Sequence, residues 1–288
     1  MPRRTEHPPA ATEPTGPAHA GALRSARRLS ALKGRRTTGQ FLAEGPQAVR
    51  EAVAAGVVAR LFVTASGSER HAELVQDAAN SGVVVLLVSD AELASLTDTV
   101  TPQGLVAVCR ATSASLDDVL ARSPRLVVVC AQVRDPGNAG TVIRCADAFG
   151  ADAVVLTQGS VDVHNPKAVR ASVGSIFHLP VVEDVSLTEA TDALKRAGLT
   201  VMAADGSGSQ TLLDLDLSVP VAWVFGNEAW GLPPADLATA DVVAKVPMWG
   251  SAESLNLSTA AAVCLYATAA AQRTSTSATR SPGSARTS

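Results

Sequence analysis

Short apolar runs and amphipathic segments alternate along most of the chain. Within residues 23–110, apolar runs predict strands at 41–43, 59–64, 83–89 and 104–109. Helical spacing of apolar positions predicts helices over about 24–36, 45–55, 68–80 and 90–96. Alternation on this scale indicates a small α/β sandwich. The segment has no nucleophile–base pair and no glycine-rich phosphate loop, so we interpret it as a binding domain.

Residues 125–272 show a stronger version of the same alternation. Strands are predicted at 126–133, 153–156, 199–203, 222–225 and 242–246. Helices are expected to begin near Asn138, Asn165, Leu187, Pro233 and Leu255. Because these strands are apolar on both faces, they predict a parallel sheet that is covered on both sides by helices. The fold class is therefore α/β in both domains.

Three polar, glycine-bearing loops follow predicted strands of this second domain, at 134–140, 226–231 and 249–254. Ligands of parallel sheets bind beyond the carboxyl ends of the strands, so these loops predict a binding site. The loops match neither the dinucleotide-binding nor the nucleotide-hydrolysis glycine motif. No Ser/His/Asp set has supportive spacing, and Gly206-Ser-Gly208 is typical of a turn.

Individual residues in these loops allow two interpretations each. Ser254 and Asn256 stand where the last loop becomes an almost wholly apolar helix. They are either ordinary helix caps or groups that bind a ligand. Arg144 follows Ile143 in an amphipathic helix. It is either a surface arginine or one whose guanidinium reaches an anion. Glu228 lies in the turn directly after an apolar strand, and it is either a solvated acid or a residue of the site.

Composition restricts the class of protein. The chain is 47% hydrophobic but 3% aromatic, and it has no apolar run long enough to span a bilayer. Its first twenty residues lack the apolar core of a signal peptide. The four cysteines are scattered among apolar neighbours, which is typical of reduced core thiols in a cytoplasmic protein. The five histidines form no ligand cluster in the sequence, so we expect no metal.

Charge is distributed unevenly. Residues 1–40 carry eight basic and two acidic residues, a net charge of +6, whereas residues 41–272 carry 13 basic and 25 acidic residues, a net charge of −12. Residues 1–22 and 273–288 are expected to be disordered tails, and 111–124 a polar linker with a short helix. Two basic segments are weaker candidates for RNA contacts, since solvated faces would look similar; their residues are Arg27, Arg28, Arg35, Arg36, Lys167 and Arg170.

Three motifs together carry a resemblance to one family. They are Asn138-x-Gly140-x-x-x-Arg144, Phe225-Gly-Asn-Glu228-x-x-Gly231 and Val246-Pro-Met248 with Ser254-Leu-Asn256. In order and spacing they resemble the motifs of the SpoU/TrmH family of RNA 2′-O-ribose methyltransferases, over residues 125–272. More loosely, residues 30–110 resemble the family's ribosomal-protein-L30-like substrate-binding domain. Ala229 and Trp230 depart from the residues frequent in relatives.

The resemblance implies a trefoil-knotted domain, S-adenosylmethionine as cofactor, and a homodimer with a site shared between protomers. Gly226, Val246, Met248 and Leu255 would hold the cofactor. The catalytic set would be Asn138, Arg144, Glu228, Ser254 and Asn256. The expected substrate is RNA, with 23S rRNA favoured because of the N-terminal domain. A tRNA ribose methyltransferase and a non-catalytic RNA-binding or ribosome-assembly protein are the alternatives.

The implied reaction is an in-line methyl transfer from a sulfonium to a ribose 2′-hydroxyl. A guanidinium hardly deprotonates in proteins, so Arg144 is a poor base. We therefore expect Arg144 to position the adjacent phosphate and to stabilise the developing alkoxide, with a phosphate oxygen as a possible proton acceptor. Asn138, Ser254 and Asn256 would orient the ribose and Arg144, and Glu228 would hold that network.

Overall fold

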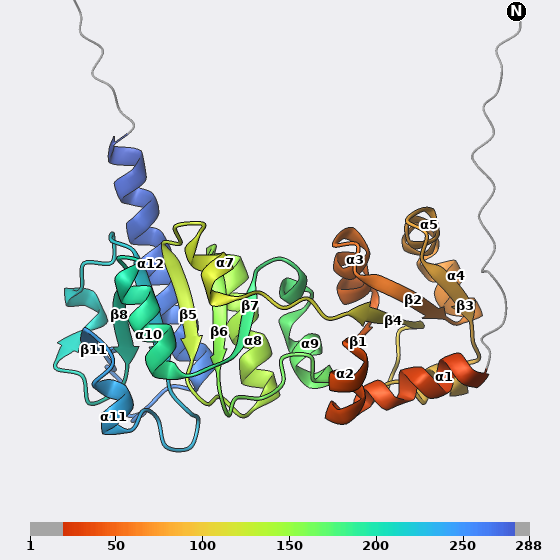
Figure 1. Ribbon diagram of the computed structural model, residues 1–288, viewed down its shortest axis with the longest axis horizontal. Helices are drawn as coiled ribbons and strands as arrows, with labels where there is room; N and C mark the ends of the chain where they lie inside the picture. Colours follow the sequence, from red (N-terminus) through yellow and green to blue (C-terminus); the bar gives the residue numbers. More distant parts are fainter. Residues whose placement is uncertain (1–19, 280–288) are drawn as a thin grey trace, which may run out of the picture. The chain divides into compact units, whose positions relative to one another are not determined.

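The chain is divided into two compact units, one ending at Ala111 and the other beginning at Thr112, as seen in a computed structural model (Figure 1). The structure describes residues 20–279, with side chains as far as Thr274. Of the tails predicted at 1–22 and 273–288, residues 1–19 and 280–288 lie outside the described part. The boundary falls one residue after the end predicted for the first domain, and each unit has its own sheet.

The first unit is built on a four-stranded sheet of order β1-β4-β2-β3. Its strands are β1 (Gln40–Glu44), β2 (Val58–Val63), β3 (Val84–Leu87) and β4 (Leu105–Arg110). Strand β4 is antiparallel to β1 and β2, and β2 is parallel to β3. Its later helices are α3 (Pro46–Ala54), α4 (Ala65–Arg70), α5 (Ala72–Asn80) and α6 (Asp90–Ala94). The predicted alternation of strands and helices is therefore confirmed.

The basic N-terminal helix differs from its prediction. Instead of one helix, the segment forms α1 (Ala20–Arg27), a 3-10 turn η1 (Arg28–Ser30) and α2 (Leu32–Thr38). Arg35 is buried, and its Nη1 donates to the carbonyls of Leu29 and Ser30, 2.9 and 2.8 Å away. This arginine satisfies carbonyls left free at the break, so its burial counts against the predicted RNA contact. The tail predicted to reach residue 22 also ends earlier, since α1 begins at Ala20.

The second unit is built on a seven-stranded sheet of order β7-β6-β5-β10-β8-β11-β9, and every neighbouring pair is parallel. The strands are β5 (Leu126–Cys130), β6 (Ala153–Thr157), β7 (Val181–Val185), β8 (Thr200–Ala204), β9 (Gln210–Thr211), β10 (Val221–Phe225) and β11 (Val242–Lys245). The predicted parallel sheet is confirmed. The prediction missed its two edge strands, because β7 carries two acids and β9 has only two residues.

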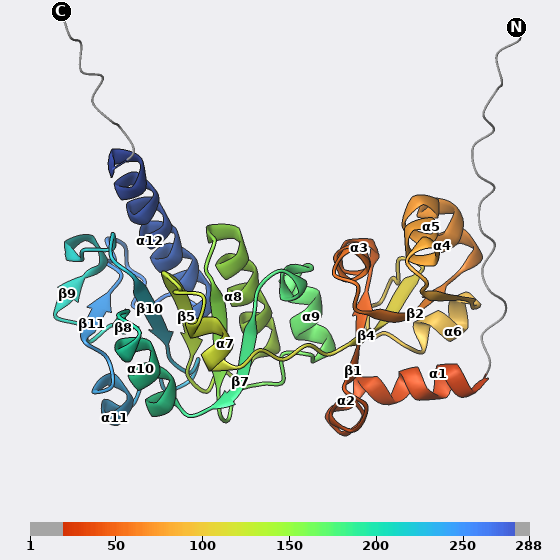
Figure 2. The ribbon, with the colours of Figure 1, turned by 45° about the horizontal axis from the view of Figure 1, so that its top comes forward.

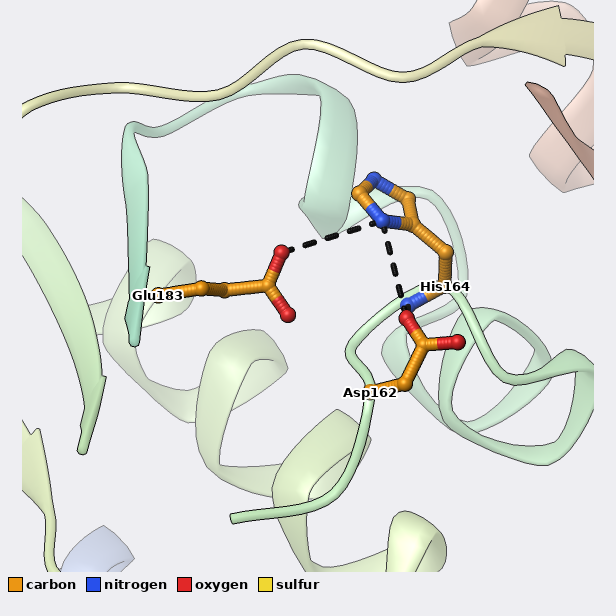
Figure 3. Close-up of side chains that lie close together, drawn as sticks. All are labelled: Asp162, His164 and Glu183. Carbon is orange, nitrogen blue, oxygen red and sulfur yellow. Dashed lines mark hydrogen bonds and ion pairs between the residues drawn. The ribbon is translucent and has the colours of Figure 1, made fainter. Parts of the chain in front are cut away.

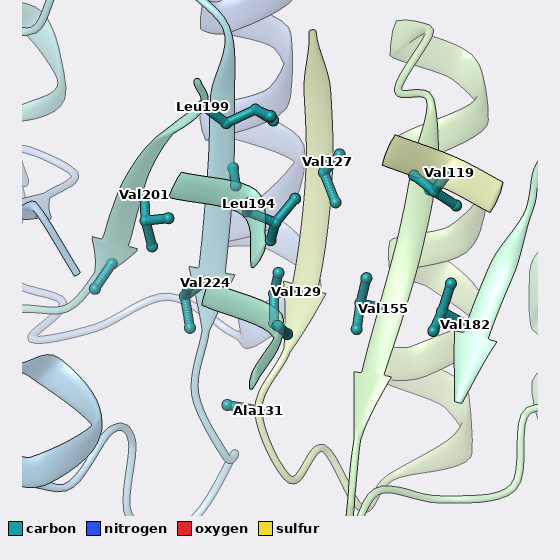
Figure 4. Close-up of a cluster of buried hydrophobic side chains, with 14 of the residues drawn as sticks. Val119, Val127, Val129, Ala131, Val155, Val182, Leu194, Leu199, Val201 and Val224 are labelled. Atoms are coloured by element: carbon teal, nitrogen blue, oxygen red, sulfur yellow. The ribbon is translucent and has the colours of Figure 1, made fainter. Parts of the chain in front are cut away.

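One face of this sheet packs against α10 (Leu187–Arg196) and α7 (Leu116–Leu120). Alternate valines of the central strands, such as Val129, Val155 and Val224, point toward Leu194 of α10 (Figure 4). Val119 of α7 belongs to the same buried cluster. The segment predicted as a linker, 111–124, therefore packs largely on the core of the second unit.

The opposite face is covered by α8 (Pro136–Phe149) and α12 (Leu257–Thr279), with α9 (Pro166–Ser172) against α8. The buried indole of Trp223 in β10 donates to Thr268 Oγ1 of α12 at 2.9 Å. Helix α12 runs antiparallel to the strands and extends beyond their amino ends (Figure 2). There Gln272 Nε2 donates to the carbonyls of Arg125 and Val219. The prediction of a disordered tail from residue 273 is thus wrong for 273–279, which continue this helix.

The remaining short elements are η2 (Ser175–Phe177), η3 (Leu212–Asp214) and α11 (Pro234–Leu237). Among the helices of residues 20–279, none is both long enough and apolar enough to cross a bilayer.

Candidate active site

Four adjacent strands, β5, β10, β8 and β11, place their following loops along one edge of the second sheet. The loops after β5, β10 and β11 are the three that the sequence predicted to form a site, and parallel pairing brings their carboxyl ends together. The loop after β8 begins with Asp205 and was predicted only as a turn. This edge of the sheet therefore holds one more loop than the prediction included.

Glu228 organises the first part of the site. Its Oε1 accepts hydrogen bonds from the backbone N–H of Asp135 at 3.1 Å and from Asn138 Nδ2 at 3.3 Å, and its Oε2 accepts from the backbone N–H of Arg134 at 3.2 Å. The carboxylate thus binds the loop that leads into α8. Next to it, Asp135 caps α8 by accepting from the Asn138 backbone N–H at 2.8 Å.

Asn138 connects this carboxylate to the start of α12. Because its amide nitrogen donates to Glu228, its Oδ1 faces away and accepts from Asn256 Nδ2 at 3.1 Å. Asn256 Oδ1 in turn accepts from the backbone N–H and the hydroxyl of Ser258, at 2.9 and 2.7 Å. Three of the five predicted catalytic residues, from three distant parts of the chain, therefore form one hydrogen-bonded chain.

The other two predicted catalytic residues, Arg144 and Ser254, stand outside this chain. Both side chains are exposed. Within residues 20–279, neither makes a hydrogen bond or ion pair with another described residue. Ser254 borders the cavity described next, whereas Arg144 lies on the exposed side of α8.

A cavity of about 460 Å³ opens beside the loops after β8 and β11. Its lining is Ala204, Asp205, Gly206, Lys245, Val246, Pro247, Met248, Glu253, Ser254, Leu255 and Ala260. Three of the four residues predicted to hold a cofactor, Val246, Met248 and Leu255, are in this lining. The volume suits a nucleoside-sized ligand, and the mixture of aliphatic walls with two carboxylates and the Lys245 ammonium suits an amphipathic one.

Gly226, the fourth predicted cofactor residue, does not line the cavity. Its backbone packs tightly inside the loop after β10, where a Cβ would lie 2.5 Å from the carbonyl carbon of Gly231. Asn227 and Gly231 exchange backbone hydrogen bonds of 3.0 and 2.9 Å, which close this turn. The buried Asn227 side chain also donates to the carbonyl of Gln132 at 2.6 Å. Gly226 is thus explained by the shape of the loop that presents Glu228.

Sequence reasoning missed the polar residues of the cavity, Asp205, Lys245 and Glu253. Asp205 stood directly after a predicted strand, which is the signal that could have found it. Its Oδ1 accepts from the backbone N–H and hydroxyl of Ser207, at 2.9 and 2.7 Å, so the carboxylate is held in place. Lys245 ends β11, and Glu253 is in the loop that precedes α12.

The basic residues predicted for RNA binding have different environments. Lys167 Nζ donates to Asp135 Oδ2 at 2.9 Å, beside the start of α8. This bond, followed by that from the Asn138 backbone, holds the pKa of Asp135 below its ordinary value. Arg170 is half-buried, whereas Arg27 is exposed and donates to Ser95 Oγ at 2.9 Å. Arg28 and Arg36 are exposed in the first unit.

One cluster departs from the expectation that no histidine joins a set of possible ligands. His164 Nδ1 lies 3.8 Å from Asp162 Oδ1 and 3.8 Å from Glu183 Oε2 (Figure 3). The sequence did not show this cluster because Glu183 comes from β7, the unpredicted strand. Both acids also accept backbone hydrogen bonds, Asp162 from His164 and Glu183 from Val163. These bonds fasten the loop before α9 to the sheet, which is a structural role.

Comparison with known proteins finds relatives of both units. Residues 125–266 match the SpoU rRNA Methylase family, and residues 22–107 match the MRM3-like substrate binding domain. The chain is 35% identical to the 23S rRNA (guanosine(2553)-2′-O)-methyltransferase RlmP of Bacillus subtilis, over 83% of this chain and 92% of that protein.

Solved structures show the same likeness. The SpoU methyltransferase AviRb from Streptomyces viridochromogenes, in complex with the cofactor AdoMet, is 31% identical with a TM-score of 0.78, covering 89% of this chain and all of that one. The AdoMet-bound rRNA methyltransferase from Sinorhizobium meliloti has 29% identity and a TM-score of 0.78, covering 88% and 96% of the two chains. The chain belongs to the SpoU rRNA methylase family.

Proposed function

We propose that this protein transfers a methyl group from S-adenosylmethionine to a ribose 2′-hydroxyl of 23S rRNA. The observation that carries the proposal is the hydrogen-bonded chain of Glu228, Asn138 and Asn256 next to a cavity of cofactor size. The names of the relatives support the RNA class, since RlmP and a 37% identical Streptomyces viridochromogenes protein, matched over 57% of this chain and 59% of its own length, are both 23S rRNA 2′-O-methyltransferases.

S-adenosylmethionine supplies the methyl group as an activated sulfonium. The residues that would hold it are those of the cavity, with Val246, Met248 and Leu255 against its apolar parts. Asp205 and Glu253 would place negative charge near its cationic groups. Gly226 contributes by allowing the turn that brings Glu228 to the edge of the sheet.

The hydrogen-bonded chain can orient an acceptor ribose because its donors and acceptors are assigned. Glu228 accepts from Asn138, which fixes the direction of the Asn138 carbonyl and hence that of the Asn256 amide. Such preorganised groups stabilise a transition state without reorganising during the reaction. Ser254, at the border of the cavity, would complete the contacts with the ribose.

Arg144 would act on the RNA phosphate and the developing alkoxide, because its guanidinium stays protonated and carries five donors. Its side chain is exposed and has no partner among the described residues, which suits an arginine that reaches RNA bound in the site of a second copy of the chain. Exposed apolar residues of α12, Val263 and Tyr266, support the same homodimer, since they form a surface that a second protomer would cover. The knot implied by the resemblance stays a prediction.

The protein is expected to act in the cytoplasm, where rRNA is made and thiols stay reduced. Its buried cysteines, Cys109, Cys130 and Cys264, are free thiols, which suits that compartment.

Incubation with S-adenosylmethionine carrying a labelled methyl tests the proposal, using rRNA and tRNA from a host that lacks this gene. Label in 23S rRNA that Arg144→Ala abolishes would support it, with Arg196→Ala, an exposed arginine of α10, as the matched control. Label in tRNA alone would overturn the choice of substrate. Bound cofactor without label in either RNA, also when intact ribosomal subunits are supplied, would indicate a non-catalytic RNA-binding protein.

A further inference from the structure

Two of the three tryptophans of this chain are exposed, and both are in loops of the candidate active site. Trp230 is 48% exposed and Trp249 is 84% exposed, whereas Trp223 is fully buried. Aromatic residues make up only 3% of the chain. Large aromatic side chains contribute most when they are buried, so leaving two of them in solvent indicates a surface that something else covers.

Their positions connect them to the two parts of the site. Trp230 stands two residues after Glu228, in the turn after β10. Trp249 directly follows Met248, which lines the cavity. The loops that carry them therefore hold the acceptor-orienting carboxylate and the cofactor cavity, respectively.

Arg134 adds a cation to the first of these positions. Its guanidinium carbon lies 5.0 Å from the centroid of the Trp230 ring, within the range of a cation–π interaction. The backbone N–H of the same residue donates to Glu228 Oε2 at 3.2 Å. The stacked pair is thus tied to the hydrogen-bonded chain of the site.

We propose that Trp230, with Arg134, and Trp249 bind unpaired bases of the RNA next to the methylated nucleotide. This inference rests on the proposed function. A ribose inside a regular duplex leaves no base free to stack, whereas nucleotides in loops and bulges present their faces to aromatic side chains. Arg134 would contact the neighbouring phosphate or the outer face of a base.

The charge of the chain bears on how an RNA would be held at this site. Residues 41–272 carry a net charge of −12, so the body attracts a polyanion poorly. Stacking on an aromatic ring binds RNA without relying on net charge, because every base has a π face. The tryptophans would therefore supply, at the site, affinity that long-range electrostatics does not.

Tryptophan fluorescence tests the contact directly, because the buried Trp223 supplies a constant background. Full-length Trp230→Phe reports on Trp249, and full-length Trp249→Phe reports on Trp230. An unmethylated 23S rRNA transcript should quench both reporters, and a fully duplex RNA of mixed sequence should quench neither. Equal quenching by the duplex, or no quenching by a transcript that binds, would overturn the inference.

Kinetics separates stacking from a structural role. Trp230→Ala and Trp249→Ala should each raise KM for the transcript about tenfold, while Phe at either position restores it. Leu213→Ala, at a 71% exposed apolar residue of η3, should leave KM unchanged. Unchanged KM in the alanine variants of an active enzyme would refute stacking and leave the proposed function intact. A wild-type enzyme without activity on rRNA would refute the proposed function instead.

Sedimentation of the same variants examines the competing occupant, a second copy of the chain. Alanine variants that sediment like the wild-type protein would support the RNA contact. Dissociation into smaller species would show that the tryptophans bind a protomer, and would overturn the inference.

Discussion

Replacing Glu228 by glutamine tests the central interaction of the site with a minimal change in shape. The carboxylate accepts three hydrogen bonds, two at Oε1 and one at Oε2. A glutamine has one oxygen, so its NH₂ group must face at least one of the N–H donors. The substitution therefore removes at least one bond, and it removes the charge that strengthens those that remain.

The magnitude follows from those bonds. A hydrogen bond to a charged group contributes about 1.5–3 kcal/mol, and because Glu228 is exposed we take the lower end. If this loss is felt in the orientation of Asn138 and Asn256, the transition state is destabilised by about 1.5 kcal/mol. That corresponds to about a tenfold fall in kcat. The apparent affinity for S-adenosylmethionine should stay nearly the same, because Glu228 does not line the cavity.

Steady-state kinetics with 23S rRNA measures this change, and urea unfolding shows whether the fold is kept. Glu189→Gln is the matched control, since that carboxylate also accepts from a backbone N–H and a hydroxyl, but at the start of α10. We expect the control to keep wild-type kcat. A Glu228→Gln enzyme with full kcat, alongside an inactive Asn138→Ala enzyme, would show that Asn138 acts without being oriented by the carboxylate.

Three further predictions concern stability and reactivity. The hydrogen bond from Lys167, followed by that from a backbone N–H, holds the pKa of Asp135 in the folded protein below the ordinary 3.8. The ionised carboxylate therefore stabilises the fold above about pH 4, and this stabilisation is lost as the pH falls through the lower folded pKa. In urea unfolding at a series of pH values, the stability of Asp135→Asn should fall less toward acid than that of the wild-type protein. Burial, and after it the charge of a nearby carboxylate, raises the pKa of the Cys130 thiol to about 12. A thiol reagent at pH 8 should therefore label the half-buried Cys145 before it labels Cys130. Labelling of Cys130 first would contradict this prediction. Gly140→Ala should lower the free energy of unfolding by about 1–3 kcal/mol, because its Cβ would overlap a carbonyl oxygen of α9, whereas alanine at the open glycine of α1 should not.

The sequence predicted elements well where hydrophobic periodicity determined them. The central strands are apolar at every position except Thr157 at the end of β6, so both their existence and their parallel pairing followed from the pattern. The prediction failed where polar residues occupy structural positions. Strand β7 escaped notice because Glu183 and Asp184 interrupt it, although Glu183 binds the loop before α9. Arg35 was predicted to be a surface cation, but it donates to backbone carbonyls from a buried position. That position exists because the helix is interrupted between α1 and α2, which the hydrophobic periodicity does not show.

The sequence predicted a set of candidate site residues but not the contacts between them. The family resemblance singled out Asn138, Glu228 and Asn256, the first and last of which are 118 positions apart. Which of them bond to one another depends on strand order, since β10 lies beside β5 and brings Glu228 to the start of α8. No local pattern encodes that order. The same limit explains Asp205, whose loop becomes part of the cavity only because β8 is inserted between β10 and β11.

The connection between the orienting residues and the fold suggests why the site tolerates an acidic, exposed setting. Glu228 is fixed by two backbone N–H groups of the loop into α8, and Asn256 by the first turn of α12. Both helices are anchored under the sheet, α12 through the buried bond between Trp223 and Thr268. The side chains of Glu228 and Asn256 can therefore stay exposed, because rigid elements hold them in position. What remains for the exposed residues is to capture the RNA, and Trp230 and Trp249 are placed on the two loops where that capture would align the ribose with the cofactor.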